Sequence, residues 1–282
     1  MKQTVRWHHV LFPVLCALLV VGLFESTAQE NWQDRFPHKY TAQNVTVCSD
    51  ISHDFSAIHG AHARKAWNYF SKLFRRTPGT RIELYYTNSA GLYGEILKRY
   101  PAIVIKGARQ LTALWAGDHR KWFIMPYVTP DFGTQLHEMS HDFFYFTYPK
   151  LEDSPWLKEG SGMYFESGKF DDKGDFIVPG PMLSFHSLFK ERHAKNQLIP
   201  LKELLFMTGK QFYAADFTRT YPQSMMFFFY VMEREESMMT RFFEKLNNGE
   251  FSGNRGIVDF MTAGAKKTIE EMEKGYVDYS LQ

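Results

Sequence analysis

The residues of this sequence with the clearest chemical potential are two histidines and a glutamate in the segment His137-Glu138-Met139-Ser140-His141. Residues four positions apart on an α-helix point to the same side, so the two imidazoles can bind one Zn²⁺ ion. Glu138 lies at the edge of that side, where its carboxylate can reach a water molecule on the metal. The pattern therefore predicts a helix that binds zinc and activates water. An amphipathic helix with two surface histidines is the alternative.

Apolar side chains flank the two histidines: Leu136, Met139, Phe143 and Phe144. They favour a core helix, and buried imidazoles need polar partners such as a shared metal ion. A catalytic zinc ion usually has three protein ligands and one open position for water, so a third ligand must come from another element. Glu159 lies 18 positions after His141, in the segment WLKEG, and is the candidate.

The segment from His137 to Glu166 resembles the gluzincin zinc metallopeptidases, and among them the aminopeptidase-N-like branch of the peptidase-MA-like superfamily. HEMSH is followed by WLKEGSGMYFE, and that branch carries a Trp-x-x-Glu-Gly pattern with a Tyr-x-Glu shortly after it. The resemblance implies that His137, His141 and Glu159 bind one zinc ion and that Glu138 is the general base and acid. The gap before Glu159 is one residue shorter than is usual in the branch.

Two further residues are candidates for the same site. The segment Tyr221-Pro222-Gln223-Ser224 is similar to a Tyr-x-x-small segment of the family, which implies that the Tyr221 hydroxyl stabilises an oxyanion. Glu166 lies two helical turns beyond Glu159, so its carboxylate can accept a ring N–H from a zinc-bound histidine. The alternatives are a packing aromatic for Tyr221 and a solvent-facing carboxylate for Glu166.

Two patterns of related families are missing. Aminopeptidases of the branch carry a Gly-x-Met-x-Asn strand that helps to bind the free amine of the substrate, and no such pattern precedes His137. The Asn-Glu-x-x-x-Asp pattern of thermolysin is missing as well, since Met163 stands four positions after Glu159. The first of these absences favours an endopeptidase, or an unknown specificity, over an aminopeptidase.

The elements that must position these residues change in character along the chain. Strands are expected at 45–48, 81–87, 102–105 and 122–127, and helices at 56–74 and 90–100. Further helices are expected at 133–146, 155–166, 201–207, 222–235, 238–246 and 268–279. An exposed excursion is expected at 171–180, and a loop around His186 and His193. The expected fold is α+β and zincin-like: a strand-rich N-terminal half with a small mixed sheet, then a mainly helical C-terminal half with the His137–His141 helix.

The N-terminal segment has the features of a secretory signal peptide. A basic start (MKQTVR) precedes an apolar run of 15 residues at 10–24, and the small residues of 26–28 follow. These features predict cleavage after Ala28. An uncleaved membrane anchor is the alternative, but crossing a bilayer takes about 20 apolar residues. Pro13 also interrupts the run.

The rest of the chain divides into an irregular arm at 29–44 and one metallopeptidase-like domain at 45–282. Within that domain we expect a strand-rich part at 45–130 and a helical part at 131–282. The mature protein is expected to be exported to the periplasm or the medium, with no stable membrane span. Cys48 would then be its single cysteine, which excludes a disulfide framework.

Composition limits the class of partner. Lys and Arg number 33 and Asp and Glu number 31, giving a net charge of +2. Proteins that bind nucleic acid usually concentrate more positive charge, so the expected partner is a peptide or protein substrate. With 44% hydrophobic and 17% aromatic residues, the chain can bury a sizeable core. The sequence leaves the oligomeric state open.

The expected function is a secreted zinc-dependent metallopeptidase that hydrolyses peptide bonds with zinc-activated water. A catalytically silent zinc-binding or peptide-binding module of the same fold is the alternative. Glu138 favours the enzyme, because a purely structural metal site has no use for a base. A hydrolase that uses the same metal chemistry on another substrate also stays open.

Overall fold

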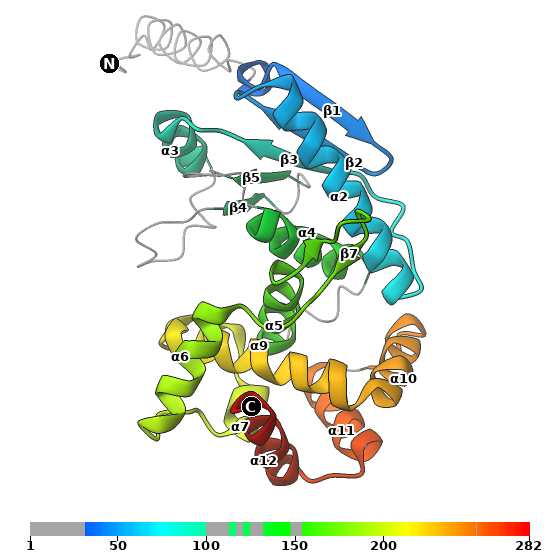
Figure 1. Cartoon of the computed structure of the whole chain (residues 1–282), viewed down its shortest axis with the longest axis vertical. Helices are drawn as coiled ribbons and strands as arrows, with labels where there is room; N and C mark the ends of the chain where they lie inside the picture. Colours follow the sequence, from blue (N-terminus) through cyan, green and yellow to red (C-terminus); the bar gives the residue numbers. More distant parts are fainter. Residues whose placement is uncertain (1–31, 100–112, 117–120, 125–131, 148–153, 252) are drawn as a thin grey trace, which may run out of the picture. The chain divides into compact units, whose positions relative to one another are not determined.

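The structure is a computed structural model that describes residues 32–99, 113–116, 121–124, 132–147, 154–251 and 253–282 (Figure 1). The predicted signal peptide at 1–28 and the predicted strand at 102–105 lie outside these residues. The chain divides into two compact units, Met1–Pro37 and His38–Gln282. In the first unit, the described residues form a short 3-10 helix, η1 (Trp32–Arg35). Every other element belongs to the second unit.

A five-stranded mixed sheet forms the N-terminal part of the second unit. Its order is β1 (His38–Ala42), β2 (Val45–Ser49), β3 (Ile82–Tyr86), β5 (Lys121–Ile124) and β4 (Ala113–Ala116). β2, β3 and β5 are parallel, and the two edge strands run antiparallel to their neighbours. All five residues of β2 are buried, as expected for an inner strand. The small mixed sheet expected from the sequence is therefore confirmed.

The arm predicted as irregular at 29–44 contains strand β1, so that prediction is wrong for its last part. β1 pairs with β2 from His38 opposite Ser49 to Ala42 opposite Val45. The turn between the two strands uses Gln43 with a φ of 52°. Glycine usually marks such a conformation, so a turn without glycine concealed this hairpin in the sequence.

Two helices connect the strands of the sheet. α2 (His53–Leu73) follows β2, and α3 (Ala90–Arg99) follows β3. Both helices were predicted, although α2 begins three residues earlier than expected because the Ser52 hydroxyl accepts a hydrogen bond from the Phe55 N–H at 3.0 Å. Ala63, Ala66 and Phe70 recur along one side of α2 and are fully buried. This side packs toward the sheet and the next helix.

Three helices that pack one on the next form the centre of the second unit: α4 (Phe132–Thr147), α5 (Pro155–Glu166) and α9 (Phe217–Arg234). α4 contacts α2, α5 contacts α4, and α9 contacts α5, so α4 and α5 lie between the sheet layer and the C-terminal helices (Figure 1). Aromatic rings fill the junction of α2, α4 and α5. The ring centroids of Phe70 and Phe165 are 4.4 Å apart, and those of Phe74 and Phe143 are 5.2 Å apart.

The remaining helices are α6 (Leu183–Ala194), α7 (Leu201–Phe206), α8 (Gly209–Ala214), α10 (Glu236–Asn247), α11 (Gly253–Ala265) and α12 (Ile269–Ser280). Of these, α6, α10 and α12 pack against α9, and α7 packs against α11 and α12. The sequence predicted α7, α10 and α12 and missed α8 and α11. With its mixture of helices and small sheets, the described part of the chain is α+β. Within it, no helix is long and apolar enough to cross a membrane.

Three predictions in the C-terminal half need correction. The expected excursion at 171–180 carries part of a hairpin, β6 (Lys169–Phe170) and β7 (Phe176–Ile177), and Phe176 is buried against Tyr69. The loop expected around His186 and His193 is helix α6. α9 begins five residues before Pro222, because Asp216 accepts a hydrogen bond from the Thr218 N–H and caps the helix.

Gly160 allows α5 and α9 to approach closely. A Cβ atom at this position would lie 2.6 Å from the backbone oxygen of Ser224 on α9, closer than two such atoms can pack. The side of α5 that faces α9 therefore requires a residue without a side chain.

We predict that Gly160→Ala lowers the free energy of unfolding by about 1–3 kcal/mol, because the added methyl group must push two backbones apart. Urea unfolding followed by circular dichroism measures the change. Gly94→Ala in α3 is the matched control, since a Cβ there meets no atom within 4 Å. That control should raise stability by about 0.5–1 kcal/mol through better helix propensity. Equal effects of both variants would contradict the steric argument.

Candidate metal centre

A buried cluster of hydrogen bonds around Gln135 holds the start of α4, the helix that carries the two histidines, in place. The Gln135 side-chain oxygen accepts a hydrogen bond from the Tyr86 hydroxyl at the end of β3 and lies 2.8 Å from His59 Nδ1 on α2. The Gln135 amide donates to the His59 carbonyl oxygen at 3.2 Å. All three side chains are fully buried. α4 is therefore held to both the sheet and α2 directly before its histidines.

His137 and His141 lie one helical turn apart on the side of α4 that faces α5. Their ring centroids are 4.6 Å apart and the ring planes are nearly perpendicular, at 84°. Their side chains are only 13% and 7% exposed. The segment is thus a largely buried helix, and the alternative of two surface histidines is wrong.

Glu159 on α5 reaches both imidazoles. Its Oε2 atom lies 3.4 Å from Nε2 of His137 and 3.7 Å from Nε2 of His141. One ligand atom from each of these three residues lies within 4.8 Å of the others, so the group could hold a metal ion. Two imidazole nitrogens and one carboxylate oxygen are donors that suit divalent transition metals.

Gly162 leaves the space in front of the histidines open. A Cβ atom on this residue would lie 2.8 Å from Nε2 of His137 and 3.0 Å from Cε1 of His141. Gly160 and Gly162 are two positions apart, about 200° around a helix. Gly160 therefore allows α9 to pack closely on one side of α5, and Gly162 leaves room for the imidazoles of α4 on the opposite side.

The start of α5 is held from a distant part of the chain. Pro155 occupies the first turn, where its missing N–H costs no helical hydrogen bond. The Asn254 side-chain oxygen on α11 accepts hydrogen bonds from the Ser154 hydroxyl at 2.9 Å and from the Trp156 indole N–H at 3.1 Å. These bonds anchor the helix one turn before Glu159.

Glu166 hydrogen-bonds to one of the histidines. Its Oε2 atom lies 2.8 Å from Nδ1 of His137, on the side of the ring opposite the atom that faces Glu159. Such a bond directs the other nitrogen of the ring and increases its basicity. The solvent-facing alternative does not describe this residue, since its side chain is 25% exposed and bonded. Its role toward a metal stays a prediction.

Tyr213 on α8 is a residue that the sequence did not indicate. Its hydroxyl donates a hydrogen bond to Oε1 of Glu159 at 2.6 Å, while Oε2 faces the imidazoles. The two oxygens of Glu159 therefore have different partners. No spacing rule could have found Tyr213, because it lies 54 positions from Glu159 and the contact depends on tertiary packing.

Tyr221 lies on α9 with its ring 5.7 Å from that of Phe212. Burial raises the pKa of its hydroxyl, and the negative charges of Glu159 and Glu138 raise that pKa further. The hydroxyl is therefore a protonated donor near these carboxylates. It also packs as an aromatic residue, so the two interpretations made from the sequence are compatible.

The surroundings of the titratable groups in the site shift their pKa values in different directions. Burial raises the pKa of Glu138 to about 7, although the charge of His137 opposes that shift. Burial lowers the pKa of His141 to about 4. Burial also lowers the pKa of His137, but hydrogen bonds to Glu159 and Glu166 outweigh it and raise that pKa well above the usual value. The adjacent imidazoles hold the pKa of Glu159 well below its usual value, against the effect of its burial.

Comparisons with protein-family models and with curated proteins give no match to this sequence. The site is therefore interpreted from its own geometry. The structure brings together His137, His141 and Glu159, with Glu166 bonded to the first of them. A group of this composition is not specific to gluzincins, so the family resemblance stays a proposal.

We predict that binding of a divalent ion at pH 7 releases about one proton. His137 carries a proton in the metal-free site because its pKa is raised, and a ligand imidazole must be neutral. Metal affinity should accordingly rise with pH until that pKa is passed. Calorimetric titration with Zn²⁺, Co²⁺ and Mn²⁺ in buffers of different ionisation enthalpy measures the number of protons released for each ion bound. Glu166→Gln should release fewer protons at pH 8, since one carboxylate that holds the proton is gone. No release from either protein would contradict the prediction.

We also predict that Gly162→Ala weakens binding of the divalent ion by roughly 10–100-fold, the range typical of changes that displace metal ligands. The added methyl group would meet the edges of both imidazoles. The same calorimetric titration measures the affinity, with Gly94→Ala as the glycine-to-alanine control. Unchanged affinity in a folded Gly162→Ala protein would show that the ion binds elsewhere.

Proposed function

We propose that this protein is an exported zinc-dependent metallopeptidase of the gluzincin type that hydrolyses peptide bonds. The observation that carries the proposal is the convergence of His137, His141 and Glu159 around one point, with their ligand atoms within 4.8 Å of one another. Glu138 stands next to His137 on the same helix. This set matches the number of protein ligands of a catalytic zinc site, plus one separate base.

One zinc ion held by these three residues would polarise the scissile carbonyl and activate water. Glu138 would take the proton of the attacking water as the C–O bond forms. It would then pass that proton to the leaving amine as the C–N bond breaks. In the metal-free site burial raises the pKa of Glu138 to about 7, which makes its carboxylate a stronger base than that of an exposed glutamate.

Two tyrosines would assist the reaction in different ways. Tyr221 would donate a hydrogen bond where negative charge develops on the carbonyl oxygen, and its raised pKa keeps the hydroxyl protonated. Tyr213 would position Glu159 through the 2.6 Å bond to Oε1, leaving Oε2 for the metal. Glu166 would orient His137 in a similar way.

The broader parts of the proposal rest on the sequence and on the order of the elements. A small mixed sheet that precedes the histidine helix is consistent with a zincin-like arrangement. The basic and apolar segments at 1–28 support export to the periplasm or the medium. Endopeptidase activity on peptides or proteins is favoured, because the strand pattern that recognises a free amine is missing.

The decisive experiment compares the purified protein with Glu138→Gln. Zinc content is measured by mass spectrometry and cleavage by digestion of a mixed peptide library. We expect one zinc ion in both proteins and a loss of cleavage of about 10²–10⁴-fold in the variant. Glu191→Gln, which changes a solvent-exposed glutamate on α6, should keep full activity.

Other outcomes select other functions. Zinc without cleavage by the wild type would indicate the catalytically silent module. Equal cleavage by wild type and Glu138→Gln would remove the proposed base. Absence of zinc from both proteins would overturn the peptidase and the silent module together.

A further inference from the structure

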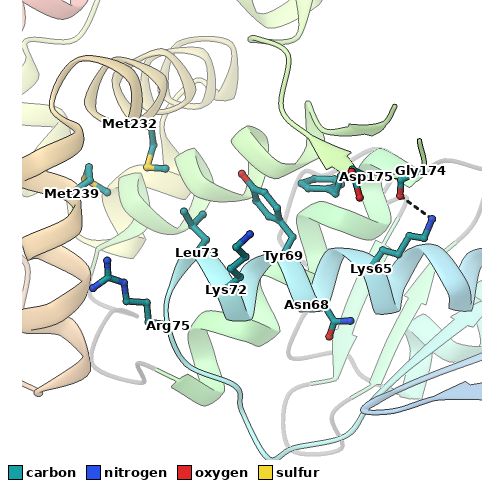
Figure 2. A pocket seen from close by; sticks show the side chains of 11 residues that line it. Lys65, Asn68, Tyr69, Lys72, Leu73, Arg75, Gly174, Asp175, Met232 and Met239 are labelled. Atoms are coloured by element: carbon teal, nitrogen blue, oxygen red, sulfur yellow. Dashed lines mark hydrogen bonds between the residues drawn. The ribbon is translucent and has the colours of Figure 1, made fainter. Parts of the chain in front are cut away.

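A cavity lies away from the candidate metal centre, between α2, the turn of the β6–β7 hairpin, and helices α9 and α10 (Figure 2). Its volume is about 860 Å³, and no residue of the metal centre lines it. Small-molecule sites typically have volumes of about 300–1,000 Å³. The cavity is therefore of a suitable size for a small organic ligand.

One wall of this cavity is apolar. It consists of Tyr69, Leu73, Phe176, Met232 and Met239. Phe176 and Met239 are buried, and the other three are partly buried. Methionine side chains are flexible and polarisable, so they adapt to apolar ligands of different shapes. Residues from three separate parts of the chain thus build one apolar surface.

A cationic rim adjoins this wall and comes from α2 and the residues just after it (Figure 2). Lys65 donates a hydrogen bond to the Gly174 carbonyl oxygen at 2.8 Å, and Arg75 pairs with Glu244 at 3.1 Å. Lys72 lies between them, and in the described part of the chain no carboxylate pairs with it. Among the described residues of the lining, Asp175 is the single acidic one. The rim therefore retains a positive charge beside the apolar wall.

We propose that this cavity binds an organic anion with an apolar body, whose carboxylate or phosphate meets Lys72 and whose body lies against Met232 and Met239. The charge of Lys72 has no counterion among the described residues, and an anionic head group would supply one. The apolar wall would remove the ligand's body from water, which favours binding. This binding needs no metal and does not rest on the proposed peptidase activity.

The test uses dodecanoate, dodecyl phosphate, dodecanol and inorganic phosphate as probes in isothermal calorimetry. The two amphiphilic anions are titrated below their critical micelle concentrations, and dodecanol below its solubility limit. We expect the two amphiphilic anions to bind, dodecanol to bind at least tenfold more weakly, and inorganic phosphate to show no binding. The tighter of the two anions identifies the head group. Binding by neither anion, or equal binding of dodecanol and dodecanoate, would overturn the proposal.

Variants locate the binding. Lys72→Met keeps the length of the side chain and removes its charge, so dodecanoate affinity should fall at least tenfold. Lys274→Met is the control, because Lys274 on α12 is 80% exposed and outside the cavity. Met232→Gln should also weaken the binding of dodecanoate. It should weaken the binding of dodecanol by a similar factor, so that the ratio of the two affinities changes little. If Lys72→Met binds dodecanoate like the wild type, while circular dichroism shows it folded, the assignment of the head-group site is wrong.

Discussion

A carboxylate removed from water needs compensation on both of its oxygens, and Glu159 on α5 receives it from two other helices. Tyr213 of α8 bonds to one oxygen, and the imidazoles of α4 approach the other. An uncompensated buried charge costs several kcal/mol, so these helices cannot separate without a large loss of stability. The contacts of Glu159 thus determine both how α4, α5 and α8 pack together and the geometry of the candidate metal centre.

α5 satisfies this constraint with residues of two opposite kinds. Glu159 and Glu166 carry polar groups toward His137, while Gly160 and Gly162 carry no side chain at all. The glycines lower helix propensity by about 1 kcal/mol each compared with alanine. Close approach of α9 on one side and of the imidazoles on the other explains why the helix contains them. The cost in local stability is therefore offset by tertiary contacts.

Much of this arrangement could be predicted from the sequence, because it depends on helical periodicity. The helix of the two histidines and α5 are predicted almost to the residue. Glu159 follows from the resemblance of WLKEG to a family pattern, and Glu166 from its spacing of two helical turns along α5. The contacts of Tyr213 and Asn254 could not be predicted, since each links segments that are far apart in the chain. Strand β1 was missed because Gln43 adopts a positive φ without glycine. The identity of the metal and the catalytic roles depend on chemistry that neither periodicity nor geometry determines.

The anchoring of α5 by Asn254 has a consequence for the order in which the chain is made. Asn254 follows Ser154 by 100 positions, so its side chain emerges from the ribosome long after the ligand helices. A nascent chain can form α4 and α5 early, but the hydrogen bonds that α5 and its first turn receive from Tyr213 and Asn254 wait for α8 and α11. The hydrogen bonds that anchor the start of α5 therefore cannot form until Asn254 has been synthesised.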